Sequence, residues 1–233
     1  MLSRIERPEA GPFIDASALF HESVYAFVTL KDACGTDEPA LIRFLEERGC
    51  FCTRVHRVEQ VHSGTVVDAD RAPCKADGLL CNRPGEAVRV VTADCVPILL
   101  ATKDGRRIAA VHAGWKGTRA GIVEAAVVRL RAGNESGVSA YIGPAIGACC
   151  YAVDEERYGA FRDAFPGWVG DGGGRPVLDL PALNVRMLER AGVGPDDIHV
   201  EDRCTACSIG LCCSYRRDGV AAGRMAAVVG RRR

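Results

Sequence analysis

Three residues with reactive side chains lie at the ends of short apolar runs in this 233-residue chain. They are His62 in Gln60–Ser63, Cys95 directly before Val96–Ala101, and His112 after Arg107–Val111. Strand ends are places where a rigid scaffold presents side chains to a cleft. We therefore expect the three side chains to share one site.

Two imidazole rings and one thiolate form a ligand set that suits zinc, and three protein ligands leave a fourth position open, as in catalytic zinc sites. Such an ion lowers the pKa of its water towards roughly 7 and provides a hydroxide nucleophile. The plainer alternative is a buried cysteine and two ordinary histidines. Spacing by itself favours that alternative, because ligands from three separate strands have no signature of the CxxC kind.

An anion site is a second possibility beside His112. The chain runs through the glycine-rich segment 114–117 into a helix expected to begin near Thr118. Free backbone N–H groups at a helix N-terminus bind anions, and Lys116 and Arg119 would add positive charge. The alternative is that Thr118 only caps the helix.

Two further arginines, Arg216 and Arg217, follow Ser214 near a turn at Asp218-Gly219. Guanidinium groups clamp phosphates or stack on bases. The alternative is that these arginines only pair with Asp218. Both interpretations stay open.

The twelve cysteines have no secretion signal before them, so we expect reduced thiols, most of them small buried hydrophobic residues. Cys204 and Cys207 form a CxxC pair. No second CxxC follows at zinc-knuckle spacing, since Cys212-Cys213 is only an adjacent pair, and the βαβ context of a thioredoxin-type motif is missing. The sequence therefore favours an ordinary structural role for Cys204 and Cys207.

Hydrophobic periodicity and turn residues predict more strands than helices, without regular alternation. Asp104-Gly105 predicts a hairpin between two of the strands. The expected helices are Pro39–Arg48, Thr118–Arg131, Glu155–Ala164 and a helix capped by Asp179 that runs to Ala191. The expected strands are Cys52–Val58, Thr65–Asp68, Ala87–Val91, Pro97–Thr102, Arg107–His112, Val138–Ile142, Ile198–Glu201 and Met225–Val229. This pattern indicates a single α+β domain.

Charge and hydropathy exclude several classes of protein. Lys and Arg together number 30 and so do Asp and Glu, whereas nucleic-acid-binding and membrane-surface proteins normally carry a basic excess. No stretch reaches the roughly 20 apolar residues of a spanning helix, and the N-terminus carries charges where a signal peptide needs an apolar run. We expect a cytoplasmic enzyme for small molecules, with no nucleic-acid or membrane partner.

The ordered set of motifs resembles the YfiH-like laccase-domain family, also described as multifunctional purine nucleoside phosphorylases or peptidoglycan editing factors. The similarity covers roughly residues 55 to 230. The matching stretches are Gln60–Ser63, Ala76–Leu79, Thr92–Pro97, Ala110–Gly117, Tyr141–Ile146 with Cys150-Tyr151, and Asp202–Gly219 with Gly223-Arg224.

The resemblance implies that His62, Cys95 and His112 are metal ligands and catalytic residues, usually with Zn²⁺ and with Cu²⁺ as a possibility. It implies two mixed sheets packed between helices, in helix/sheet/sheet/helix layers. The implied activities are phosphorolysis of adenosine, inosine and methylthioadenosine, and deamination of adenosine at C6. Nucleoside and phosphate are then the partners, and the available anion donors are Lys116, Thr118, Arg119, Arg216 and Arg217.

The first 50 residues depart from the family pattern. The stretch Val28–Gly35 lacks the arginine and serine of the usual Thr-Arg-x-Gly-Gly-x-Ser sequence. Cys212-Cys213 replaces the usual aromatic residues, and Ala222 stands where threonine is common. These changes affect the expected substrate more than the expected metal site.

Two other enzyme classes compete with this assignment. In a cysteine hydrolase acting on an amide or a cell-wall precursor, Cys95 would be the nucleophile and His112 the base. A copper phenol oxidase needs several coppers and many histidines, whereas the chain has five histidines. A non-enzymatic metal-binding module would use the same three residues with a closed fourth position.

Overall fold

A computed structural model describes residues 12–31, 33, 36–133, 136–169 and 174–233. Five strands form one mixed sheet in the order β1-β2-β11-β6-β3. Its strands are β1 (Phe13–Asp15), β2 (Val24–Thr29), β3 (Arg54–His56), β6 (Glu86–Thr92) and β11 (Met225–Arg231). β11, the last strand of the chain, lies at the centre of this sheet and pairs antiparallel with both β2 and β6.

Six strands form the second mixed sheet, in the order β10-β9-β7-β8-β5-β4. Its strands are β4 (Val66–Asp68), β5 (Gly78–Cys81), β7 (Val96–Thr102), β8 (Ile108–Ala113), β9 (Val138–Ile142) and β10 (Ile198–Val200). β7 and β8 are the antiparallel hairpin predicted from Asp104-Gly105, and Gly105 has the positive φ of 66° that such a turn requires.

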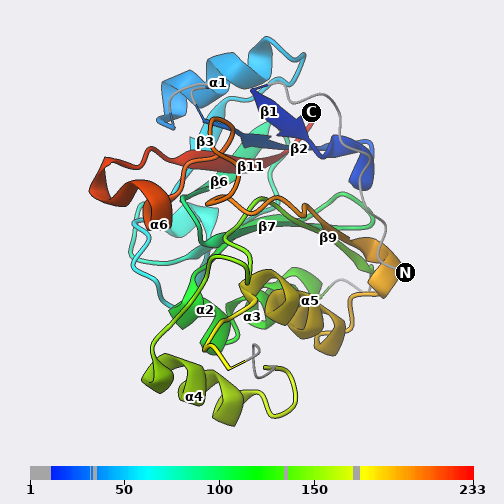
Figure 1. Cartoon of the computed structure of the whole chain (residues 1–233). Helices are drawn as coiled ribbons and strands as arrows, with labels where there is room; N and C mark the ends of the chain where they lie inside the picture. Colours follow the sequence, from blue (N-terminus) through cyan, green and yellow to red (C-terminus); the bar gives the residue numbers. More distant parts are fainter. Residues whose placement is uncertain (1–11, 32, 34–35, 134–135, 170–173) are drawn as a thin grey trace.

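The two sheets face each other between layers of helices, as Figure 1 shows. Helix α1 (Glu38–Glu46) covers the five-stranded sheet, where Leu41, Phe44 and Leu45 are buried against that sheet. Helices α3 (Ile122–Arg131) and α5 (Leu180–Arg190) cover the outer face of the six-stranded sheet. A third apolar cluster, including Val88, Leu99 and Val229, fills the space between the sheets. The predicted α+β domain with helix/sheet/sheet/helix layers is confirmed.

β7 and β8 are buried along their whole length, because both faces of the central strands are covered. They therefore appear in the sequence as continuous apolar runs rather than as alternating patterns. β1, β2 and β5 were not predicted. Residues 1–11, 32, 34–35, 134–135 and 170–173, which include part of the divergent N-terminal segment, lie outside the described residues.

The predicted helix Thr118–Arg131 is wrong in one respect, because the segment forms two helices. α2 (Trp115–Arg119) ends before Gly121, whose φ of 72° interrupts the helix, and α3 begins at Ile122. Thr118 therefore lies inside α2, whose N-cap is Gly114. The helix α4 (Glu155–Ala164) has its predicted bounds, and Asp179 caps α5 through Ala182 N–H, as expected. No described helix has the length and apolarity needed to cross a bilayer.

Candidate metal centre

Strand pairing brings the three expected ligands to one end of the six-stranded sheet. β7 begins with Val96 opposite Ala113 of β8, so Cys95 lies at the end of the sheet where His112 lies. His62 reaches the same point from the loop between β3 and β4. One ligand atom of each of the three side chains lies within 4.8 Å of the others. The Cys95 Sγ atom is 3.8 Å from His62 Nε2, and the two imidazole rings are nearly perpendicular, with centroids 4.8 Å apart.

Asp77 holds two of these ligands in place. It precedes β5 and is completely buried, directly beside His112, because Gly78 pairs with Val111. Its carboxylate accepts hydrogen bonds from His112 Nδ1 (2.8 Å), from His62 N–H (3.0 Å) and from the N–H and hydroxyl of Ser63. A carboxylate on Nδ1 leaves Nε2 of His112 as the ligand atom, an arrangement common in zinc sites.

Backbone strain accompanies this arrangement. His62 and Asp94 have φ values of 59° and 92°, in the left-handed region that residues other than glycine rarely occupy. Both are held there by hydrogen bonds: His62 N–H by Asp77, and Asp94 by Thr205 Oγ1 and Arg216 N–H, each 2.6 Å from its carboxylate. Strained backbone maintained in this way is typical of functional sites.

Hydrogen bonds among Asp77, His112 and Cys95 stabilise the charged forms of all three side chains. Burial opposes ionisation of Asp77, but hydrogen bonds from His112 and Ser63 lower its pKa to about 2. Burial likewise opposes protonation of His112, yet its hydrogen bonds to Asp77 and Cys95 raise its pKa to about 9. Desolvation opposes ionisation of the half-buried Cys95 thiol, but hydrogen bonds from His112 and His62 lower its pKa to about 7. A thiolate is therefore accessible near neutral pH, and the thiolate is the form that binds metal or attacks a carbon.

Gly114 leaves room for two of the ligands. A Cβ atom at this position would stand 2.9 Å from Cδ2 of His62 and 3.0 Å from Sγ of Cys95. The φ of Gly114 is −74°, so the backbone itself accepts any residue. The glycine is required by the space that the ligands occupy.

If the three side chains bind a metal ion such as Zn²⁺, we expect Gly114→Ala to weaken that binding by roughly tenfold, because the new methyl group must displace His62 or Cys95 from its present position. Competition with a chromophoric chelator measures the affinity. Gly159→Ala in α4 is the matched control, since a Cβ there meets no atom closer than 4.0 Å. Equal affinity in the two variants would show that the ligands do not need this space.

A cavity of about 640 Å³ opens onto the candidate metal centre. His62, Cys95 and His112 line it, together with two aromatic residues, Tyr151 and Tyr215. Four cations also line it: Arg57, Arg89, Arg216 and Arg224. The combination of an aromatic and a cationic lining suits a ligand that has both a flat ring and negative charge.

Arg89 is the most unusual of these cations. It is only 7% exposed, and its Nε has no hydrogen-bond partner among the described residues. Burial lowers its pKa, as does the charge of Arg57, while Asp37 and Glu38 oppose the shift. Buried charges are costly unless they are paired, so this guanidinium is well placed to receive an anion.

The five residues expected to bind an anion, all of them described, are not equally placed. Arg216 lines the cavity and donates to the carbonyl oxygens of Cys150 and Ala152. Lys116, Thr118, Arg119 and Arg217 are not among its lining residues. The Thr118 hydroxyl is buried and accepts a hydrogen bond from Asn184, and Arg217 binds Asp218 and the carbonyl oxygens of Thr205 and Cys212. Thr118 and Arg217 are therefore engaged within the protein.

Asp77, Asp94, Gly114 and Arg89 were not predicted as site residues. A signal was present for three of them, because Asp77, Asp94 and Gly114 lie within the motifs that also supply or flank the ligands. Arg89 had none. Arg89 interrupts an apolar strand. Only the packed structure shows that its Nε has no hydrogen-bond partner among the described residues.

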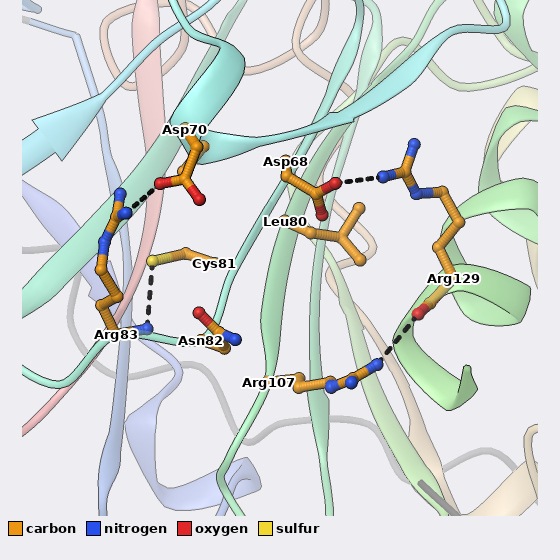
Figure 2. Close-up of a pocket in the computed structure, with 9 residues that line it drawn as sticks. Asp68, Asp70, Leu80, Cys81, Asn82, Arg83, Arg107 and Arg129 are labelled. Atoms are coloured by element: carbon orange, nitrogen blue, oxygen red, sulfur yellow. Dashed lines mark hydrogen bonds and ion pairs between the residues drawn. The ribbon is translucent and has the colours of Figure 1, made fainter. Parts of the chain in front are cut away.

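A second, smaller cavity of about 150 Å³ lies away from the metal centre, and its charged residues are paired (Figure 2). Arg83 pairs with Asp70, Arg129 pairs with Asp68, and Arg107 donates to the carbonyl oxygens that end α3. These guanidinium groups already have partners within the fold.

The chain is similar in sequence to a laccase family model and to proteins named purine nucleoside phosphorylase. A model of the family described as multi-copper polyphenol oxidoreductase laccase matches residues 28–232. A purine nucleoside phosphorylase of Deinococcus radiodurans is 42% identical over 215 residues, which cover 88% of this chain and 83% of the relative. The purine nucleoside phosphorylase YlmD of Geobacillus stearothermophilus is 35% identical over 205 residues, covering 82% and 75%.

Solved crystal structures show the same similarity over nearly the whole chain. The crystal structure of YlmD from Geobacillus stearothermophilus has a TM-score of 0.84 and 29% sequence identity, and the match covers 99% of this chain and 100% of that one. The crystal structure of the hypothetical protein YfiH of Bacillus licheniformis has a TM-score of 0.82 at 26% identity, with coverage of 97% and 98%.

Proposed function

Because the chain belongs to the YfiH-like laccase-domain family, we propose that it is a zinc-dependent purine nucleoside phosphorylase that also deaminates adenosine. The observation that supports this proposal most is the convergence of His62, Cys95 and His112 on a cavity whose wall contains Arg89, a buried cation whose Nε has no hydrogen-bond partner among the described residues. Similar proteins named purine nucleoside phosphorylase support the assignment.

The donor set fits one zinc ion. Two imidazoles and a thiolate are zinc ligands, and Asp77 supplies the carboxylate that commonly orients a ligating histidine. In such a site zinc supplies Lewis acidity and lowers the pKa of water. Cu²⁺ also accepts these donors.

Phenol oxidation by several coppers is less compatible with the described residues. Among them, the His62–Cys95–His112 group is the one candidate metal cluster that contains histidine. His56 is bonded to Glu86 and His21 to Ser23. Because a laccase needs many histidine ligands, the described residues fit a single ion at this site.

Phosphorolysis breaks the bond between ribose C1′ and the purine nitrogen and forms a bond from C1′ to a phosphate oxygen, giving the free base and ribose-1-phosphate. We assign phosphate binding to Arg89 with Arg57 and Arg216, since these cations line the cavity. The rings of Tyr151 and Tyr215 offer surfaces on which a purine can stack. Of the five residues that the sequence predicted to bind an anion, Arg216 keeps this proposed role.

Deamination adds water across the C6–N1 bond of the adenine ring and then breaks the bond from C6 to the amino group, which leaves as ammonia, giving inosine. Cys95 and His62 line the cavity that would receive such a base, and His112 is held by Asp77 in a fixed orientation.

The test incubates purified, zinc-loaded protein with inosine or adenosine, with and without phosphate. We expect phosphate-dependent hypoxanthine or adenine together with ribose-1-phosphate, and inosine from adenosine in either condition. Chromatography resolves all these products. Absence of both ribose-1-phosphate and inosine would refute the proposed function.

We expect Arg89→Met to raise the KM for phosphate by about 10- to 100-fold, the cost of losing a hydrogen bond to a charged group. The same change should leave the protein equally stable or more stable, because it removes an unpaired buried charge. Phosphate titrations and thermal unfolding measure the two effects. Arg162→Gln on the surface of α4 is the control, and an unchanged KM in Arg89→Met would refute the assignment.

A cysteine hydrolase remains the second candidate, because the Cys95 thiol has a pKa of about 7 and a hydrogen-bonded histidine beside it. Nucleophilic attack requires a free thiolate. Metal analysis separates the candidates, since a tightly bound zinc ion would occupy the sulfur. Amide hydrolysis by the metal-free protein would favour the second.

A further inference from the structure

Four cysteine side chains meet at a second place in the fold, apart from the His62–Cys95–His112 centre. Cys149 and Cys150 lie in the turn after β9, and Cys204 and Cys207 lie in the loop after β10. Their four sulfur atoms all lie within 4.8 Å of one another. We propose that these four residues bind one zinc ion in a structural tetrathiolate site.

The distances between the sulfurs fit a single tetrahedral ion. Zinc–sulfur bonds of roughly 2.3 Å give a sulfur–sulfur separation of about 3.8 Å in a tetrahedron. Sγ of Cys207 is 3.7 Å from Sγ of Cys149 and 3.4 Å from Sγ of Cys150. All four thiols are free, so no disulfide joins them. An iron–sulfur cluster would spread the sulfurs further apart, because the four cysteines then bond four different irons in a [4Fe–4S] cluster, or two irons, two cysteines each, in a [2Fe–2S] cluster.

The backbone fixes the two cysteine pairs in this arrangement. Ala145 and Cys204 form a parallel bridge, and Thr205 N–H donates to the Ala145 carbonyl. Cys150 N–H donates to the Gly147 carbonyl, which closes the turn that carries the first pair. Gly147 N–H points at Sγ of Cys204, 3.3 Å away. Hydrogen bonds to a ligating sulfur orient it and stabilise its negative charge.

Zinc at this position would join a segment that lines the cavity to a second segment that contacts a residue of the cavity wall. Tyr151, next to Cys150, lines the cavity. Arg216 donates to the carbonyl oxygen of Cys150, and Thr205, between the second pair, donates to Asp94 beside Cys95. Four protein ligands leave no open coordination position, which is the property of a structural site rather than a catalytic one.

This cluster explains why a CxxC pair without a second CxxC is still a candidate metal site. The missing two ligands are adjacent in sequence and lie more than 50 residues before the pair. The proposal does not depend on the reaction of the cavity, because it concerns a separate set of ligands. Its failure would leave the proposed phosphorolysis intact.

Metal stoichiometry tests the proposal on the full chain. Reduced protein is stripped with a chelator, titrated with Zn²⁺, and analysed by elemental analysis after gel filtration. We expect about two zinc ions per wild-type chain, one at each site. Cys207→Ser should retain one, Cys95→Ser should retain the other, and Cys74→Ser, a half-buried thiol outside both clusters, should retain two.

A measurement on the wild-type chain covers the case in which Cys207→Ser fails to fold. Alkylation followed by peptide mass spectrometry should show Cys149, Cys150, Cys204 and Cys207 protected by Zn²⁺ and modified after chelation. Co²⁺ should give the intense visible bands of a tetrahedral thiolate site in Cys95→Ser protein. A single zinc ion per chain that Cys207→Ser retains and Cys95→Ser loses, equal alkylation with and without Zn²⁺, a disulfide among the four cysteines, or iron in the purified protein would each overturn the proposal.

Discussion

Cys95→Ser is expected to lower nucleoside phosphorolysis and deamination at least 100-fold and to remove the catalytic zinc. Cys95 supplies the one thiolate of the centre, and both His62 and His112 form hydrogen bonds with it. Serine is a much weaker zinc ligand, because its hydroxyl is not ionised near neutral pH. Product formation from inosine and adenosine measures the activity, and elemental analysis measures the zinc.

Cys74→Ser is the matched control, since Cys74 is a half-buried free thiol outside both metal clusters. It should keep full activity. The three-dimensional fold of Cys95→Ser should also be unchanged, because Cys95 lies in a turn rather than within a strand. Full activity in a Cys95→Ser protein that has lost the zinc would contradict the proposed role of the ion.

Asp77→Asn is expected to lower both the stability of the fold and the affinity for zinc. The carboxylate accepts hydrogen bonds from His112, Ser63 and the backbone of the His62 loop, whereas an amide offers one oxygen and turns an NH₂ group towards these donors. Breaking a buried, charge-assisted network costs about 3–5 kcal/mol. Loss of the carboxylate behind a ligating histidine costs about 10- to 100-fold in metal affinity.

Urea unfolding and chelator competition measure the two effects. Asp163→Asn, on the exposed surface of α4, is the control and should change neither quantity. Loss of stability without loss of zinc affinity would limit Asp77 to a structural role.

The contribution of Asp77 to stability should also depend on pH. Its pKa is about 2 in the folded protein against an ordinary value of 3.8. A lowered pKa in the folded state stabilises the protein above the unfolded pKa, and this contribution disappears as pH falls. In the metal-free protein, the difference in stability between wild type and Asp77→Asn should therefore shrink between about pH 4 and pH 2. A constant difference over that range would show that the charge of Asp77 is not the cause.

Much of the fold follows from local patterns in the sequence. The apolar runs of β7 and β8 and the glycine turn at Gly105 specify a hairpin, and Asp179 specifies the start of α5. Short strands without regular alternation with helices indicate an α+β domain. The least predictable parts were β1 and β2, because their places in the sheet depend on pairing with each other and, for β2, with β11 from the other end of the chain.

The three candidate ligands are recognisable in the sequence, because their reactive side chains lie at the ends of apolar runs. Tertiary structure decided which other residues share their site. Asp77 reaches His112 through the register of β5 and β8. Arg89 lines the cavity because of how β6 is packed, and its Nε finds no hydrogen-bond partner in the part of the chain that the structure describes. The four-cysteine cluster depends in the same way on the bridge between Ala145 and Cys204. Local sequence fixes residue type and element, whereas contacts between distant segments depend on strand register and packing, to which every part of the sheet contributes.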